Sequence, residues 1–430
     1  MKKTILTLAF FSAFGIEARP VVSDVSLSQD DAGCVTITYS LSETPTIVTL
    51  DILTNALDGV GASVGGLALD RIDGDANGVV RTRECRVRWW PTGGLANRRL
   101  DLANMRASLT TWSTQEMPDY YAICLGLSNS VPRFYATRDL IAGGERDLRY
   151  KTEFLLMRRI PLAGVATRCG LGSDEPSLNG SNAARETPHW VTFSSDYYMA
   201  VYELTRWQHE LISGERLNEG LEETDELRTC PMSGLKIKTM RGSTATGPDG
   251  WPRSREVDAG SLLGRLRAFT SIAFDLPTHA QWECACRAGT TSAFNNGTNA
   301  VVTGNLGETN HCIDDCAWVP SNSEGKAHPV GLLAPNAWGL YDMHGNIDEW
   351  VLDRFAQGAD QIAAFGPDWR PGMILVDPVG ATTGNDWSFC GGAYDRETFR
   401  ARSAYRNYAP ADYNKKSLGC RLASPVPTVD

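Results

Sequence analysis

Short runs of β-branched and alternating residues fill the chain between residues 20 and 130. Residues 34–39 and 46–52 are rich in Val, Ile and Thr, and residues 86–90 alternate polar and apolar positions. Turn residues separate these runs at short intervals. Because several short strands of this kind are typical of two packed sheets, we predict a small all-β, sandwich-like domain over residues 20–130.

A change of pattern follows this β region. Residues 131–150 contain Pro132, Gly143 and Gly144, which are typical of a linker. A second and larger domain is predicted over residues 151–425. Whatever specific function the chain has is expected to lie there.

Two helix starts in the second domain are marked by a Thr followed three residues later by a Gln. In this capping box, each of the two side chains satisfies a backbone amide of the other residue. The spacing predicts helices that begin after Thr205 and Thr278, and the second should end before Gly289. A third helix is predicted over residues 261–269.

Beyond residue 290 the chain is mostly loop, with Gly, Asn, Pro and Trp prominent. Buried irregular backbone leaves donors and acceptors that regular ladders cannot satisfy. We therefore expect side chains or bound ions to provide the missing partners. The fold class predicted for the whole chain is α+β, with an irregular C-terminal domain.

Charge and the N-terminus restrict the partners and the location. The chain has 51 acidic and 41 basic residues and no basic run, which argues against nucleic acid as a partner. Lys2 and Lys3 precede an apolar run, and small residues follow it, as in a secretory signal peptide over residues 1–18. No later stretch is long enough to span a bilayer. We therefore expect an extracytoplasmic protein that is periplasmic, attached to the cell surface or secreted.

The eleven cysteines are compatible with an oxidising compartment, although their odd number leaves one thiol unpaired. No Cys-x-x-Cys pair and no His-x-x-x-His spacing occurs. A closed zinc site or an iron site held by histidines therefore has little support.

Several segments of the second domain form one recognisable series. They are Met157-Arg-Arg-Ile-Pro161, Glu186-Thr-Pro-His-Trp-Val-Thr192, Leu276-Pro-Thr-His-Ala-Gln-Trp282, Asp342-Met-His-Gly-Asn-Ile-Asp-Glu-Trp350, Gly391-Gly-Ala-Tyr394, Arg402-Ser-Ala-Tyr-Arg406 and Leu418-Gly-Cys-Arg421. In this order and spacing, over about 275 residues, the series resembles the formylglycine-generating enzymes, also called sulfatase-modifying factors.

The resemblance implies an irregular, loop-rich fold related to C-type lectins. It also implies a descent from enzymes that oxidise a cysteine of a sulfatase to formylglycine with an active-site cysteine pair and copper. Other branches of the family are iron-dependent sulfoxide synthases, pigment-maturation enzymes or modules without catalysis.

A calcium ion is expected near Asp342. Two carboxylates lie seven residues apart around Gly345 and Asn346, where backbone carbonyls can turn inward, and such oxygen ligands suit calcium. The matching family ligands would be Asp342, Glu349 and the carbonyls of Gly345 and Ile347. The alternative is a carboxylate pair that only accepts hydrogen bonds from backbone amides.

The active-site cysteines of the family are missing. In the family they follow the Gly-Gly pair, but here residues 395–401 contain no cysteine. In addition, Ala393 stands where the family has Ser, and Asp348 stands where it has Trp. Because these positions depart together, we predict that the ancestral oxidation is lost and that copper is not bound.

Cys390 and Cys420 are the remaining candidates for a catalytic thiol. They replace an Arg and a Phe that flank the same region in the family. We predict a structural disulfide between them, and the alternative is a displaced reactive pair. Cys312 and Cys316 are expected to form a second disulfide in a loop.

A binding groove is predicted beside the Gly-Gly pair, where the family docks its substrate peptide. Aromatic and basic side chains interleave there, a mixture that suits an acidic or sugar-like ligand. The candidate residues are Tyr394, Arg396, Arg400, Arg402 and Arg406. The same segment could equally be a solvated surface.

Three functions remain open at this point. The preferred one is an exported, non-oxidising binding or accessory module, stabilised by calcium, whose partner is an exported protein, a peptide or a glycan. The alternative is an active oxidase of the formylglycine-generating type that acts on a cysteine of a partner such as a sulfatase. The third is an accessory factor that matures an exported protein.

Overall fold

The structure is a computed structural model that describes residues 19–55, 61–113, 116–172, 175, 185–215, 224–242, 257–299, 311–381 and 384–428. The predicted signal peptide, residues 1–18, lies outside these ranges.

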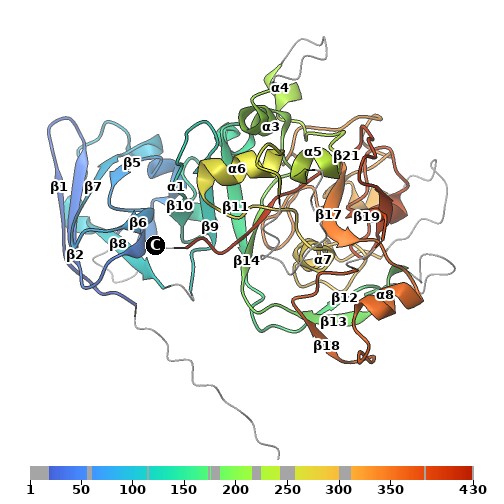
Figure 1. The fold of residues 1–430 in the computed structure, drawn as a ribbon. Helices are drawn as coiled ribbons and strands as arrows, with labels where there is room; N and C mark the ends of the chain where they lie inside the picture. The colour runs from blue at the N-terminus through green and yellow to red at the C-terminus, as the bar shows by residue number, and fades with distance from the viewer. Residues whose placement is uncertain are drawn as a thin grey trace, which may run out of the picture.

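The N-terminal strands form two sheets, as predicted (Figure 1). One sheet has the order β1 (Val22–Gln29), β2 (Val35–Leu41), β7 (Glu84–Trp90) and β5 (Arg71–Gly74). The other has the order β4 (Ala62–Ser63), β3 (Thr46–Thr54) and β6 (Gly78–Val80), with β8 (Met105–Trp112) paired to β3.

The alternation of buried and exposed residues explains why the two sheets pack together. Every second residue of β2 and β7 is buried, so each strand turns one apolar face inward. Ile37 and Val87 from one sheet share a buried cluster with Val48 and Leu50 from the other. The prediction of a small sandwich is confirmed.

The main sheet of the C-terminal domain includes strands that lie before and within the predicted linker. It has the order β10 (Arg133–Tyr135), β9 (Tyr120–Cys124), β11 (Phe154–Ile160), β14 (Tyr197–Ala200) and β22 (Ala423–Pro425). β9 falls within the range predicted for the sandwich, and β10 falls within the predicted linker. Both strands therefore belong by hydrogen bonding to the sheet that carries the C-terminal domain.

The described residues of the C-terminal domain form three further small sheets. The first has the order β12 (Thr167–Cys169), β13 (His189–Thr192) and β18 (Ile374–Val376). The second has the order β20 (Asn407–Pro410), β19 (Asp386–Cys390), β17 (Asp348–Arg354) and β21 (Leu418–Gly419). The third consists of β15 (Ala317–Trp318) and β16 (His344–Gly345). Helix and strand make up 18% and 31% of the structure, so about half of it is irregular. The predicted mixed, loop-rich fold is confirmed.

The helices begin where the sequence predicts. α3 (Arg206–Ser213) and α7 (His279–Arg287) both have a complete capping box, and α6 (Leu262–Thr270) is capped by Ser261. In the described residues the other α-helices are α1 (Gly65–Ala68), α4 (Asp225–Arg228), α5 (Ile237–Arg241) and α8 (Ala359–Ala364).

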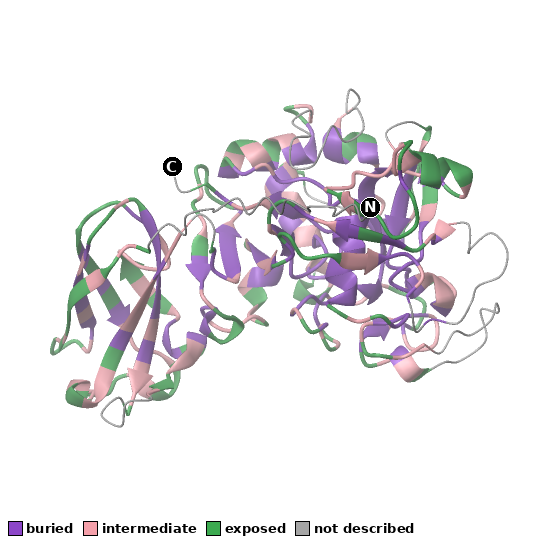
Figure 2. Ribbon diagram, turned by 90° about the horizontal axis from the view of Figure 1, so that it is seen from below, coloured by how far each residue is buried: buried purple, intermediate pink, exposed green. Residues whose placement is uncertain are grey.

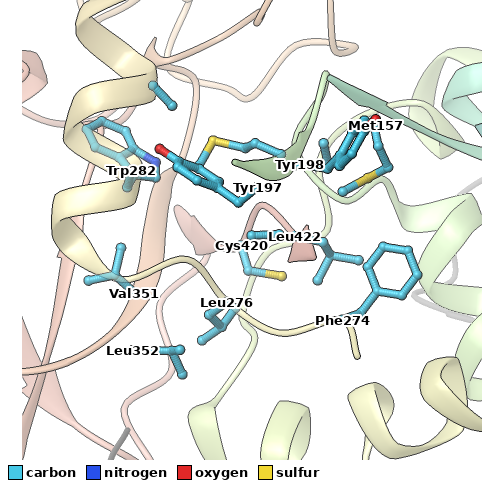
Figure 3. Close-up of a cluster of buried hydrophobic side chains, with 14 of the residues drawn as sticks. Met157, Tyr197, Tyr198, Phe274, Leu276, Trp282, Val351, Leu352, Cys420 and Leu422 are labelled. Carbon is cyan, nitrogen blue, oxygen red and sulfur yellow. The ribbon is translucent and has the colours of Figure 1, made fainter. Parts of the chain in front are cut away.

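α7 is the centre of the C-terminal domain. All nine of its residues are buried, and Trp282 is fully enclosed among side chains from β14, β17 and the C-terminal segment (Figure 3). Figure 2 shows the same concentration of buried residues within this domain. A helix buried on all sides must have partners for its polar side chains, and Arg287 pairs with Glu283 and Glu175 at 2.9 and 3.0 Å.

No helix in the described part of the chain is long and apolar enough to cross a membrane.

Two buried thiols meet where β12 packs on α7. The Sγ atoms of Cys169 and Cys284 lie 3.5 Å apart, and both residues are fully enclosed. We expect refolding with glutathione disulfide to join them, because a small rotation brings the sulfurs to the bonding distance of ~2.05 Å. Each chain then transfers two electrons and two protons to one glutathione disulfide, which yields two glutathione molecules.

Peptide mapping by mass spectrometry should find the two cysteines in one cross-linked pair. The bond should stabilise the domain by about 2–4 kcal/mol relative to the reduced protein. Cys284→Ser should lose this gain, whereas Cys420→Ser should keep it. Recovery of Cys169 and Cys284 as free thiols after oxidative refolding would contradict the prediction.

Candidate functional site

The Gly391-Gly392 turn sits against the predicted calcium loop. It follows β19, and its two glycines adopt φ values of +95° and +72°. A Cβ atom on Gly392 would lie 2.8 Å from the backbone of Ala401, so only glycine fits there. Backbone hydrogen bonds from Gly345 to Gly391 and from Tyr394 to Asn346 join the turn to the loop.

The segment after the turn forms a half-buried surface of paired charges. Arg400 Nε lies 2.6 Å from a carboxylate oxygen of Glu397, and Lys415 Nζ lies 2.9 Å from Asp395. Tyr394, Arg396 and Arg400 are all partly exposed, as a binding groove requires. Three of the five predicted groove residues are therefore together on one surface.

The other two predicted groove residues lie inside the domain. Arg402 is fully buried and pairs with Glu186 at 2.7 Å and with Glu175 at 3.1 Å. Arg406 is also buried and donates to the carbonyls of Arg185 and Ala356. Both guanidinium groups satisfy interior acceptors and are not available to a ligand on this surface.

Asp348 is a buried residue next to Arg396 of this surface. It is 3% exposed, and Arg396 Nε lies 3.5 Å from its Oδ2 atom, which has no hydrogen-bond partner in the described part of the chain. Burial raises the pKa of Asp348 to about 7, and Arg396 opposes this shift. The sequence signal for Asp348 was its place at a position where the family has Trp, but its pairing with Arg396 was not predicted.

Glu349, the second carboxylate of the predicted calcium loop, belongs to a buried ion pair. Arg421 Nη2 lies 2.9 Å from its Oε1 atom, and Arg421 Nε donates to both oxygens. Trp282 Nε1 donates to Oε2 at 2.6 Å. All three residues are at most 1% exposed. The guanidinium thus occupies the place where a cation bound to Glu349 would lie.

The rest of the loop offers few ligands. Asp342 accepts a hydrogen bond from the Gly331 amide through Oδ2, whereas its buried Oδ1 atom has no partner in the described residues. Those residues contain no cluster of three or more His, Cys, Asp or Glu side chains arranged to hold a metal ion. Calcium takes 6–8 oxygen ligands, about twice what Asp342 and the carbonyls of Gly345 and Ile347 supply, so these groups alone do not complete a calcium site.

A third carboxylate was missed at this site. Glu203 is fully buried, accepts from Asn346 Nδ2 at 2.7 Å, and accepts from the Ile347 amide at 3.2 Å. Burial first, and then the nearby Asp342 and Glu349, raise its pKa well above the ordinary value. Its sequence signal was a lone acidic residue within an apolar, strand-like run.

The predicted disulfides are absent. No disulfide bond joins any two cysteines in the described part of the chain. Cys390 on β19 lies opposite Glu349 of β17 in the sheet. Gly419 on β21, which precedes Cys420, lies opposite the same Glu349 on the other side of β17. Cys390 and Cys420 are thus two strand spacings apart, about 10 Å, which exceeds the ~7 Å limit between the Cα atoms of a disulfide. The predicted disulfide between Cys312 and Cys316 is not formed either.

Another thiol lies beneath the turn. Cys286 Sγ lies 3.5 Å from Ser403 Oγ and 3.7 Å from His344 Nε2. Burial raises the pKa of Cys286 to about 12 and lowers the pKa of His344 to about 4. The pair therefore remains a neutral thiol and a neutral imidazole, because burial disfavours the thiolate–imidazolium form that a nucleophile requires.

Comparison with known proteins shows which family the second domain resembles. The family model of the sulfatase-modifying factor enzyme 1-like domain matches residues 172–426. The formylglycine-generating enzyme of Mus musculus is 26% identical over 307 residues, which cover 64% of this chain and 77% of that protein. The enzyme of the same name from Thermomonospora curvata is 32% identical over 157 residues, covering 35% of this chain and 48% of that protein.

Two solved structures resemble the chain at lower identity. Treponema denticola variable protein 1 is 22% identical with a TM-score of 0.45, and the match covers 63% of this chain and 95% of that one. PvdO from Pseudomonas aeruginosa is 19% identical with a TM-score of 0.44, and the match covers 63% and 94%.

Replacing Arg421 with Met should destabilise the C-terminal domain by about 3–5 kcal/mol, because it leaves the carboxylate of Glu349 buried without a counter-charge. Denaturant unfolding followed by tryptophan fluorescence measures the loss. Lys416→Met, which removes an exposed cation five residues earlier in the chain, should change stability little.

Since Arg421 takes the cation's place, a calcium chelator should leave the unfolding midpoint of the natural protein unchanged. A clear fall with the chelator would restore the calcium site.

Asp348 should make stability fall as pH rises. Its pKa of about 7 in the folded protein exceeds the ordinary value of 3.8, which applies to the unfolded chain. Its contribution to the free energy of unfolding is therefore complete below the pKa of the unfolded chain and is lost as pH rises through the pKa of the folded protein. Between pH 5 and pH 8 this loss amounts to about 3 kcal/mol.

The variant Asp348→Asn should remove this part of the pH dependence, while Asp412→Asn at an exposed position should keep it. Chemical unfolding at several pH values measures both. Parallel pH profiles for Asp348→Asn and the natural protein would refute the assignment.

Proposed function

Because this chain belongs to the sulfatase-modifying factor enzyme 1-like family, we propose that it has kept the family scaffold as a binding or accessory module and no longer oxidises cysteine. The single observation that carries the proposal is the state of its thiols. Residues 391–406 contain no cysteine, and the thiols nearest the turn, Cys286 and Cys390, are 0% and 1% exposed.

Copper chemistry of the ancestral kind requires thiolates that a substrate and a metal can both reach. Burial raises the pKa of Cys286 and of Cys390, so each stays a protonated thiol at neutral pH. Cys420 is fully enclosed, and burial raises its pKa as well. The residues present do not fit a copper ion bound at the surface of the turn.

The surface over Asp348 is the proposed binding site. Tyr394 and Phe399 offer partly exposed rings, and Arg396 and Arg400 offer guanidinium groups. The family resemblance supports this position, because the family docks its substrate peptide beside the Gly-Gly pair. Aromatic rings beside arginines suit an exported protein or peptide with acidic side chains, or a glycan, as the partner.

Export and rigidity complete the proposal. The charged start and apolar run of residues 1–18 support removal of a signal peptide and an extracytoplasmic location. N-terminal sequencing of the mature protein tests this, and an N-terminus at Met1 would contradict it. We propose that Arg421 stabilises the loop from Asp342 to Glu349 in place of the calcium ion that the resemblance implies.

A peptide with a sulfatase cysteine motif should bind without being converted. With copper(I) and oxygen present, mass spectrometry should detect no formylglycine, whereas the mouse formylglycine-generating enzyme in the same buffer should form it. An acidic version of the peptide should bind more weakly to Arg396→Ala/Arg400→Ala than to the natural protein, and Lys326→Ala, at an exposed cation elsewhere, should bind normally. Turnover that Cys390→Ser or Cys420→Ser abolishes would overturn the proposal.

A further inference from the structure

A second cavity lies apart from the Gly391-Gly392 turn and contains none of the residues between Tyr394 and Arg400. Its volume is about 220 Å³. It lies where α8 closes over β13, the start of α7 and the end of β17, elements that Figure 1 shows in the same part of the C-terminal domain. Its polar lining comes from His189, His279, Asp353, Gln361 and Arg406.

Two polar atoms of this lining are buried without a partner. Nε2 of His279 and Oε1 of Gln361 have no hydrogen bond in the described part of the chain, although the two residues are only 6% and 4% exposed. An unsatisfied buried polar group costs about 1–3 kcal/mol, so such atoms indicate a ligand or ordered water.

His189 adds an acceptor of known orientation. Its Nδ1 atom lies 2.8 Å from the carbonyl oxygen of Thr187. A carbonyl can only accept, so Nδ1 carries the hydrogen and Nε2 carries a lone pair. Burial lowers the pKa of His189 to about 4, which keeps the ring neutral, and the ring packs against Phe365 with 4.5 Å between centroids.

The charges of the lining restrict the ligand further. Arg406 is buried, and its positive charge helps to lower the pKa of both histidines. Asp353 accepts from the His279 amide, and burial raises its pKa to about 7. A cation would face Arg406, and an anion would face the lone pairs of His189 and Gln361. A neutral group that both donates and accepts meets neither repulsion.

We propose that this cavity binds a small neutral polyhydroxylated molecule, of monosaccharide size or below. Hydroxyl groups would donate to Nε2 of His189 and to Oε1 of Gln361. They would accept from the guanidinium of Arg406, which lines the cavity. The size follows from the volume, which is smaller than the ~300–1,000 Å³ of pockets for drug-sized ligands. Apolar contacts from Phe365, Ala280 and Leu375 would cover the C–H faces of a sugar or polyol.

Ligand-observed NMR on the full chain tests the proposal with glycerol, glucose, galactose and mannose as probes, and with acetate and methylammonium as charged controls. At least one polyol should bind with millimolar affinity or better, and neither ion should bind. Gln361→Leu should weaken polyol binding about tenfold, because a lost hydrogen bond of ~1.4 kcal/mol has this effect. The exposed Gln357→Leu should bind like the natural protein.

A second variant covers the case in which Gln361→Leu does not fold. Ala364→Leu fills the cavity from a partly exposed position of α8 and should abolish binding. Failure of all four polyols to bind would mean that the cavity holds ordered water only, and preferential binding of either ion would refute the charge argument. Because the assay involves no thiol and no sulfatase peptide, its result is independent of the test for oxidation.

Discussion

The buried pair of Arg421 and Glu349 is the interaction on which the C-terminal domain depends. The guanidinium of Arg421 donates to Glu349, to the adjacent backbone carbonyls of Ala200 and Val201, and to the carbonyl of Tyr341 in another segment of the chain. Glu349 in turn accepts from Trp282 of α7. One charged group thus joins β14, β17, α7 and the C-terminal segment. A domain that is half irregular needs such a junction, because its sheets are too small to satisfy the interior carbonyls.

Other buried arginines extend the same solution. Arg287 donates to the carbonyls of Gly170 and Ser292, and Arg406 donates to those of Arg185 and Ala356. A guanidinium has five donors in a fixed plane, so it can collect carbonyls that a bound ion would otherwise coordinate. The expectation that loop-rich backbone needs extra partners was correct, and buried arginine side chains provide several of them.

Local features were predictable from the sequence, whereas contacts between distant strands were not. The capping boxes at Thr205 and Thr278 involve residues three apart, so their spacing is sufficient to locate α3 and α7. The Cys390–Cys420 disulfide was wrong because its geometry depends on which strand lies between the two cysteines, and β17 does. Arg402 alternates with aromatic residues along the segment as Arg400 does, and only the tertiary fold shows that Arg402 points to Glu175 and Glu186 instead of the surface.

The position of β22 has a consequence for biosynthesis. This strand pairs with β14, and Ala423 also exchanges backbone hydrogen bonds with Asp275, so residues more than 140 positions apart must meet before the central sheet is complete. The two sheets of the N-terminal sandwich are built from β1 to β8 and can form early during translation. The larger domain cannot close until the ribosome has released residue 425, and until then its apolar surfaces, including that of α7, are available to chaperones or export factors.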